Sequence, residues 1–145
     1  MIEPVLLDTT GWIALLNTSD NLHESARRIW ERLAEQKTPI VVTEWVVAET
    51  GNGLARFPVR VGFRRAVELI ESSPRATLIT VDQALRQAAL RLYGDRPDKT
   101  WGLVDCASFV IMKERAIRTA FTDDQHFKQA GFRRLLGPEQ EVQAQ

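Results

Sequence analysis

Several acidic residues lie near the ends of predicted secondary-structure elements, or two turns into a helix in the case of Glu49, so that their side chains could converge on one site. The candidates are Asp8, Glu49, Asp105, Asp123 and Asp124. Converging carboxylates repel one another and raise each other's pKa, and a divalent cation removes that repulsion. A ligand set made only of oxygen atoms suits Mg²⁺ or Mn²⁺ rather than Zn²⁺. One or two such ions would orient a water molecule, lower its pKa and promote hydrolysis of a phosphodiester.

Each of these acids also has a purely structural interpretation. Asp8 could cap the helix that follows the first strand, and Asp105 could stabilise a helix N-terminus through the helix dipole. Glu49 alone would be interpreted as a surface acid, and the Asp123–Asp124 pair as turn residues. The residues by themselves leave both interpretations open, because each signal is weak when it is taken alone.

Three other polar residues form a second tier around the acids. Asp98 lies in a loop seven residues before Asp105, and we interpret it as a structural residue rather than one that contacts the water shell of a metal. Thr9 directly follows Asp8, and Thr122 directly precedes the Asp123–Asp124 pair. Their hydroxyls could hold water or a phosphate oxygen, and a turn or capping bond is an equally good interpretation.

The histidines and tryptophans are interpreted mainly as packing residues. The chain has only two histidines, His23 and His126, so a zinc site built on histidine is not expected. His126 follows Asp124 by two positions and could approach a phosphate, but packing is the preferred interpretation. Trp101 is the exception, because it lies in the loop before Asp105 and could stack on an RNA base.

The elements that would hold these residues alternate between strands and helices. Apolar runs predict strands at residues 4–8, 40–43, 76–80 and 119–122, and a short fifth strand within residues 131–136. Helical spacing or capping residues predict helices from residue 12, from Asp20 and Asn21 to about 36, around Glu49, and over 59–71, 82–93 and 103–115. We therefore predict the α/β class, a three-layer α/β/α sandwich around a mostly parallel sheet of four to five strands. Sites in such sheets form at the carboxyl ends of the strands, near the switch in strand order.

The distribution of charge is more informative than its sum. The chain has 19 basic and 19 acidic residues, so its formal net charge of zero gives no general attraction for nucleic acid. No acid occurs between Glu49 and Glu68, yet Arg56, Arg60 and Arg64 lie there. This stretch is either a solvated helix face or a surface that holds RNA phosphates.

Length and composition indicate one domain over residues 1–137, followed by a polar tail at residues 138–145. The single cysteine, Cys106, fits a reducing compartment. The apolar runs are too short to span a bilayer, and the N-terminus does not have the pattern of a signal peptide. We therefore expect a cytoplasmic protein without membrane contact.

Five segments, in order along the chain, resemble the PIN domain family. They are VLLDTTGWIALLN, DNLHESARRIW, VVTEWVVAET, DKTWGLVDCASFVIMKERAI and AFTDDQHFKQAGFRRLL. The resemblance covers about residues 5–136 and implies that the metal-binding acids are Asp8, Glu49, Asp105 and Asp124. The last segment is the most distinctive, because the family's closing pattern of a threonine, one residue and an aspartate selects Thr122 and Asp124. Asp123 could share or replace that role.

The resemblance also implies an activity. Members with this pattern are endoribonucleases that depend on Mg²⁺ or Mn²⁺ and leave a 3′-hydroxyl and a 5′-phosphate. Many small members are VapC-type ribonuclease toxins, which implies an RNA substrate, an antitoxin protein as partner and a homodimer. The arginines between Glu49 and Glu68 would then hold the RNA backbone. The choice of RNA over DNA follows from the resemblance alone.

Two other functions remain open on the sequence. A PIN-like module could keep its acids and bind RNA without cutting it. A phosphoacceptor signalling domain is also a parallel α/β fold with an acidic pocket, but such domains carry a pair of acids after the first strand and a lysine after the last. Here Thr9 follows Asp8, and no lysine follows the last strand at a suitable place.

Overall fold

A five-stranded parallel sheet forms the centre of the structure, a computed structural model that describes residues 2–138. Its strands are β1 (Val5–Leu7), β2 (Ile40–Thr43), β3 (Ala76–Ile79), β4 (Thr119–Phe121) and β5 (Arg133–Arg134). They lie in the order β3-β2-β1-β4-β5, and every neighbouring pair is parallel. The chain therefore extends the sheet from β1 in one direction as far as β3 and then continues on the other side of β1.

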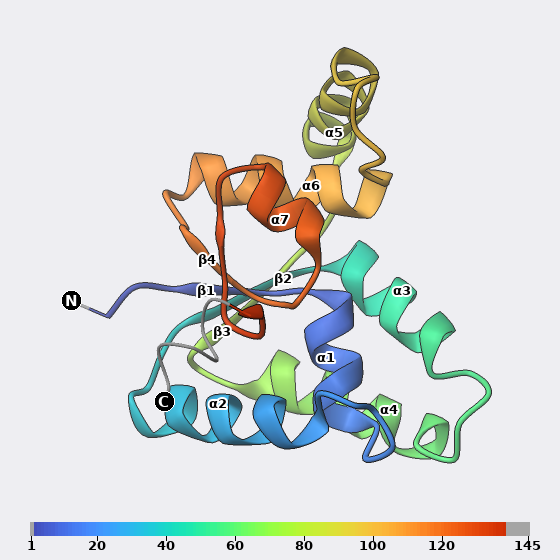
Figure 1. Cartoon of the computed structure of the whole chain (residues 1–145), viewed down its shortest axis with the longest axis vertical. Coiled ribbons are helices and arrows are strands. Elements are labelled where there is room, and N and C mark those ends of the chain that lie inside the picture. Colours follow the sequence, from blue (N-terminus) through green and yellow to red (C-terminus); the bar gives the residue numbers. More distant parts are fainter. Residues whose placement is uncertain (1, 139–145) are drawn as a thin grey trace.

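Helices cover both faces of this sheet. Within the described residues they are α1 (Thr9–Leu16), α2 (His23–Glu35), α3 (Glu44–Gly53), α4 (Arg60–Ser72), α5 (Gln83–Asp95), α6 (Leu103–Glu114) and α7 (Gln125–Gln129). Figure 1 shows α5, α6 and α7 on one side of the sheet and α1, α2 and α4 on the other. This arrangement confirms the predicted three-layer α/β/α sandwich, with a sheet of five strands.

Two cores lie on the two faces of the sheet, because successive residues of a strand point to opposite sides. Leu6 of β1 packs with Phe109 of α6 in the first core. Its neighbour Leu7 packs with Trp12 of α1 in the second core. Both faces of β1 are buried, which explains why its sequence is a continuous apolar run rather than an alternating one.

Polar side chains fix where several helices begin. The hydroxyl of Thr43 accepts a hydrogen bond from the backbone N–H of Val46 at the start of α3. Asp82 caps α5, as predicted, and accepts a hydrogen bond of 2.8 Å from the backbone N–H of Leu85. The predicted cap at Asp20 is wrong, because its carboxylate accepts from the backbone N–H of Leu22 in the turn ahead of α2.

The first helix begins three residues earlier than predicted, at Thr9 rather than Trp12. Gly11 is expected to interrupt regular secondary structure, but the structure places it inside α1 and gives another reason for a glycine there. A Cβ atom built on Gly11 would lie 2.0 Å from the carbonyl oxygen of Phe121 in β4. Glycine is therefore needed so that α1 can approach the neighbouring strand closely.

The end of the chain differs from the prediction in two details. The fifth strand is confirmed, but it consists of Arg133 and Arg134, in the middle of the predicted segment. It pairs with β4 through Thr119 and Ala120. Helix α7 was not predicted, because its five residues are too few and too polar to show helical spacing.

Two expectations from the sequence concern membranes and the C-terminus. No helix within residues 2–138 combines the length and the apolar character that a membrane span needs. Apart from Pro138, the predicted polar tail lies outside the described residues.

Candidate metal centre

Three of the predicted acids meet at the carboxyl edge of the sheet, where the strand order switches. Asp8 directly follows β1, and Asp124 follows β4, the neighbouring strand. Asp105 reaches the same edge from the first turn of α6. Open parallel sheets bind ligands at this kind of position, as the sequence predicted.

Asp8 is held by hydroxyl groups in a buried position. Its side chain is 2% exposed, and Thr122 donates a hydrogen bond of 2.8 Å from Oγ1 to Oδ2. The hydroxyl of Thr10 lies 2.8 Å from that of Thr122 and 3.5 Å from the same carboxylate oxygen. Asp8 stands at the N-cap position of α1, but its side chain makes no capping bond. The alternative interpretation of Asp8 as a helix cap is therefore not supported.

The pKa of Asp8 responds to this environment. Burial raises it from 3.8 to about 7, and the hydrogen bond from Thr122 partly opposes that rise. The negative charges of Asp105 and Asp124 also raise it, and the backbone N–H of Thr9 lowers it. Mutual repulsion among carboxylates is the effect expected of acids that lie close together, and it adds to the larger effect of burial.

Asp105 has one carboxylate oxygen fixed by two donors. Its Oδ2 accepts a hydrogen bond of 3.1 Å from the backbone N–H of Gly102, which caps the start of α6. The same oxygen lies 2.9 Å from Nδ1 of His126. Burial raises the pKa of Asp105, while the bond to His126 lowers it. The helix-terminus interpretation of Asp105 thus holds, and the residue also belongs to the acidic cluster.

Asp124 is the N-cap residue of α7. Its Oδ1 accepts a hydrogen bond of 2.9 Å from the backbone N–H of His126 and lies 3.5 Å from Nδ1 of the same residue. The backbone N–H of Asp124 in turn donates to Oγ1 of Thr122 at 3.0 Å. Because the hydroxyl of Thr122 also donates a hydrogen bond to Asp8, this one group connects the two acids that follow β1 and β4.

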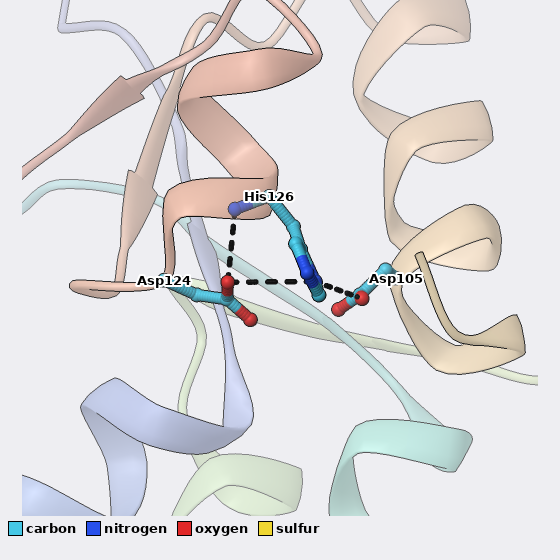
Figure 2. Close-up of side chains that lie close together, drawn as sticks. All are labelled: Asp105, Asp124 and His126. Carbon is cyan, nitrogen blue, oxygen red and sulfur yellow. Dashed lines mark hydrogen bonds and ion pairs between the residues drawn. The ribbon is translucent and has the colours of Figure 1, made fainter. Parts of the chain in front are cut away.

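The donor set fits a hard divalent cation. Ligand atoms of Asp105, Asp124 and His126 all lie within 4.8 Å of one another. Figure 2 shows one oxygen of each carboxylate bonded to His126, and the other oxygen of each projecting below the ring. Among the described residues, no donor occupies these other oxygens of Asp105 and Asp124. Asp8 is not one of this close group and is linked to Asp124 through the hydroxyl of Thr122. Carboxylate oxygens are the ligands that Mg²⁺ or Mn²⁺ prefers.

The other predicted acids lie outside this close group. Glu49 is exposed on the second turn of α3 and does not belong to the group of ligand atoms. Asp98 is exposed and makes two hydrogen bonds of 2.9 Å with the guanidinium of Arg96, which suits the structural interpretation. Asp123 contributes its backbone carbonyl, which accepts a hydrogen bond of 2.9 Å from the buried Arg134. Of the two adjacent aspartates, it is the carboxylate of Asp124 that joins Asp105.

The second-tier threonines differ in their placement. Thr122 is fully buried and bonded to Asp8, as described above. Thr9 is also buried, and its hydroxyl has no hydrogen-bond partner among the described residues. The structure thus gives Thr122 a clear place in the site and leaves the role of the Thr9 hydroxyl as a prediction.

The predicted RNA-binding arginines lie on the surface between α3 and α4 and on α4 itself. Arg56 is exposed in the connection between the two helices. Arg60 donates to the carbonyl of Ala55, and Arg64 lies 3.3 Å from the carboxylate of Glu68. They are accessible to a ligand, and their contact with RNA remains a prediction.

Two aromatic residues have roles that the sequence did not reveal. The packing interpretation of His126 is wrong, because its ring contacts two acids of the cluster. The only available signal was its position two residues after Asp124. The expectation that Trp101 stacks on RNA is also wrong, because Trp101 is buried against Phe109 and donates from Nε1 to Gln129.

A cavity of about 550 Å³ lies at the opposite edge of the sheet and is a different feature. It is lined by residues of α2 and by residues at the amino ends of β1 and β4, including Val5, Leu33 and Thr119. None of the candidate acids lines it. The size of a cavity therefore does not locate the metal centre in this fold.

Comparisons with known proteins agree with the fold and with the order of the motifs. The family described as "PIN domain" matches residues 5–133. The chain is 32% identical to the 23S rRNA-specific endonuclease VapC20 of Mycobacterium tuberculosis, in both strain CDC 1551 / Oshkosh and strain ATCC 25618 / H37Rv. The match extends over 133 residues, which are 88% of this chain and 95% of that protein. The crystal structure of Mycobacterium tuberculosis VapC20, described as a Sarcin-Ricin loop cleaving toxin, has a TM-score of 0.78 and 26% identity, with coverage of 88% and 95%.

Proposed function

This chain belongs to the PIN domain family, and from that premise we propose that it is an endoribonuclease that depends on Mg²⁺ or Mn²⁺. The observation that supports the proposal most directly is the gathering of Asp8, Asp105 and Asp124, whose charges act on one another. Three carboxylates held close together are unfavourable without a cation. They lie at the switch in strand order, where open parallel sheets bind ligands. Asp105 and Asp124 are partly exposed there, whereas Asp8 is buried beneath them.

The residues of the chain would divide the work as follows. Asp8, Asp105 and Asp124 hold the cation, and Glu49 completes the acidic cluster directly or through water. When bound, the ion supplies a polarised water molecule and charge stabilisation for phosphodiester hydrolysis. Thr122 keeps the carboxylate of Asp8 in place through the bond of 2.8 Å. Asp123 and Asp98 would contribute at most to the loops that frame the site, and Thr9 to the start of α1.

RNA is the substrate class that we propose. The relative VapC20 is named for its action on 23S rRNA, and its crystal structure is described by cleavage of the Sarcin-Ricin loop. The exposed Arg56, Arg60 and Arg64 would bind the phosphates of the RNA backbone, because guanidinium groups make bidentate contacts with phosphate. A structured ribosomal RNA segment is therefore the first substrate to test.

The partners follow from the same relatives. We propose that the chain is a VapC-type toxin that is neutralised by an antitoxin protein and that acts in the cytoplasm. We also propose a homodimer, since the exposed apolar residues Leu90 and Tyr93 lie three positions apart on one face of α5. Light scattering coupled to size-exclusion chromatography tests the dimer. The boundary of the domain at residue 137 also remains a prediction.

A cleavage assay tests the central proposal. The purified protein is incubated with 23S rRNA and Mn²⁺, and Asp8→Asn serves as the variant with an altered cluster. We expect cleavage by the wild type, no cleavage after chelation of the metal, and a large loss in Asp8→Asn. Equal cleavage by both proteins would reject the assignment of Asp8. RNA that is bound but not cut, over a range of metals and substrates, would instead support a binding module.

A further inference from the structure

His126 contacts two acids of the cluster at once, with different parts of the residue. Its Nδ1 lies 2.9 Å from Oδ2 of Asp105 on α6. Its backbone N–H donates at 2.9 Å to Oδ1 of Asp124, which precedes it by two positions at the start of α7. The side chain is about one-quarter exposed, at 27%, so the ring lies at the border of the site and is not buried in a core.

We propose that His126 is the positioning residue of the metal centre, because it fixes the direction in which Asp105 and Asp124 present their remaining oxygens. This inference rests on the proposed function, since it assumes that a cation binds between these acids. Neither relative's name nor the family match assigns a role to this histidine. The proposal gives this imidazole a role other than that of a ligand, although it lies within the group of possible ligand atoms.

Both ring nitrogens of His126 are already engaged. An ionised carboxylate can only accept hydrogen bonds, so Nδ1 must carry the hydrogen that faces Asp105. The other nitrogen, Nε2, lies 3.2 Å from Oγ1 of Thr100 in the loop before α6. The lone pair of the neutral ring then lies on Nε2, which faces Thr100 rather than Asp105. A ring held from both sides suits a group that orients a ligand, as the partners of metal-binding residues commonly do.

The geometry shows what the orientation achieves. The backbone N–H of Gly102 and the ring of His126 both bond Oδ2 of Asp105, so this carboxylate cannot rotate freely. Its Oδ1 then projects toward Asp124 (Figure 2). The backbone of His126 restrains the carboxylate of Asp124 in the same way through Oδ1. One residue thus sets the mutual orientation of two acids from two different helices.

Metal affinity tests the proposal with matched variants. We expect His126→Ala to bind Mn²⁺ about 10- to 100-fold more weakly than the wild type, which is the usual effect of removing an outer partner of a ligand. His126→Asn places an amide N–H near the position of Nδ1 and should recover most of the loss. His126→Gln places its amide nearer the position of Nε2 and should not. His23→Ala is the control, because the other histidine bonds the carbonyl of Ala14 away from the acids.

Two spectroscopic measurements on the wild type do not depend on a folded variant. In the metal-free protein, long-range ¹H–¹⁵N correlations should show a proton on Nδ1 of His126, and an unprotonated Nδ1 would overturn the proposal. With Mn²⁺ bound, spin-echo EPR should lack the ¹⁴N modulation of a coordinated imidazole. Such modulation, lost on removal of His126, would make the residue a ligand and would also overturn the proposal.

The outcomes separate this inference from the proposed function. If the wild type binds Mn²⁺ and His126→Ala binds it equally well, the positioning role is rejected while the metal centre stands. If the wild type binds no Mn²⁺ or Mg²⁺, both the positioning role and the metal-dependent activity are rejected. Circular dichroism of each variant confirms that a weaker affinity is not caused by loss of the fold.

Discussion

The hydroxyl of Thr122 lies 2.8 Å from Oδ2 of Asp8, although 114 positions separate the two residues along the chain. The same hydroxyl accepts the backbone N–H of Asp124. A single buried oxygen atom therefore connects the ends of β1 and β4 and sets the spacing of two acids. The five predictions that follow test this connection, the acids, the packing beneath them and the surface around them.

Replacing Thr122 by valine removes the hydroxyl without changing the shape of the side chain. We expect Thr122→Val to lower the free energy of unfolding by about 1–3 kcal/mol, because buried polar groups of Asp8 and Asp124 lose their partner. RNA cleavage should also fall. Urea unfolding at pH 8 and the cleavage assay measure the two effects. Thr122→Ser is the matched control, since it keeps the hydroxyl and should retain most of both properties.

The stability of the metal-free protein should depend on pH through Asp8. Its pKa is about 7 in the folded protein and 3.8 as a free side chain. As pH rises from about 4 to about 7, the unfolded chain has lost this proton while the folded chain still holds it, so stability falls. This shift lowers the free energy of unfolding by about 4 kcal/mol at pH 8, relative to its value at low pH.

Asp8→Asn removes this cost, because the amide stays neutral at every pH. We expect the metal-free variant to be more stable than the wild type at pH 8 and nearly equal to it at pH 4. Asp98→Asn, at an exposed acid paired with Arg96, should show no such gain. Urea unfolding across this pH range in the presence of a chelator decides the point. A stability gain that does not change with pH would contradict the assignment.

Gly11 and Gly62 form a matched pair for the contact between α1 and β4. A Cβ at position 11 would overlap the backbone carbonyl of Phe121, whereas a Cβ at position 62 on α4 meets no atom within 4 Å. Gly11→Ala should therefore destabilise the fold strongly and displace the start of α1 next to Asp8. Gly62→Ala should be neutral or should stabilise the fold by up to about 1 kcal/mol through helix propensity. Thermal unfolding of the two variants measures the difference.

Divalent metal should stabilise the folded protein by mass action. At a Mn²⁺ concentration about 100 times the dissociation constant, the expected gain is about 2.7 kcal/mol. For a chain of this size that corresponds to a rise in Tm of about 5 to 10 °C. Differential scanning fluorimetry with and without EDTA measures it. The rise should be much smaller in Asp105→Asn, and an equal rise in both proteins would place the metal elsewhere.

The arginine surface can be tested by its dependence on salt. We expect Arg56→Gln, Arg60→Gln and Arg64→Gln each to weaken RNA binding and to reduce the slope of log affinity against log salt by about 0.7 per lost phosphate contact. Arg27→Gln is the control, because Arg27 is paired with Glu24 and Glu31 on α2. If the slopes of Arg56→Gln, Arg60→Gln and Arg64→Gln all equal that of the wild type, this surface does not contact the RNA.

Most of the fold could be predicted because its signals are local. The strands β1, β2 and β4 are short apolar runs, and both faces of each are buried. Strand β5 has a weaker signal, because the apolar residues that predicted it flank the strand, while Arg133 and Arg134 form it through their pairing with β4. Helix α7 depends on the local cap at Asp124 and on the burial of Phe127, and that burial needs the folded neighbours.

The convergence of three acids could be predicted from the sequence, but the hydrogen bonds that connect them could not. Asp8, Asp105 and Asp124 stand at the ends of elements, and the topology alone brings them together. The bond between His126 and Asp105 joins residues 21 positions apart and exists only because α6 and α7 are packed side by side. Spacing along the sequence therefore could not reveal it. The role of Glu49 in the acidic cluster remains a prediction, and a metal titration of a Glu49 variant can test it.

The order of the strands has a consequence for the protein during its own synthesis. Of the five strands, the central strand β1 is made first, yet one of its two neighbours, β4, is made only after β2 and β3. A nascent or prematurely terminated chain that stops before β4 carries Asp8 but has neither Thr122 nor Asp124. For the proposed ribonuclease, such unfinished copies would lack two of the groups that form the site and should not cleave RNA.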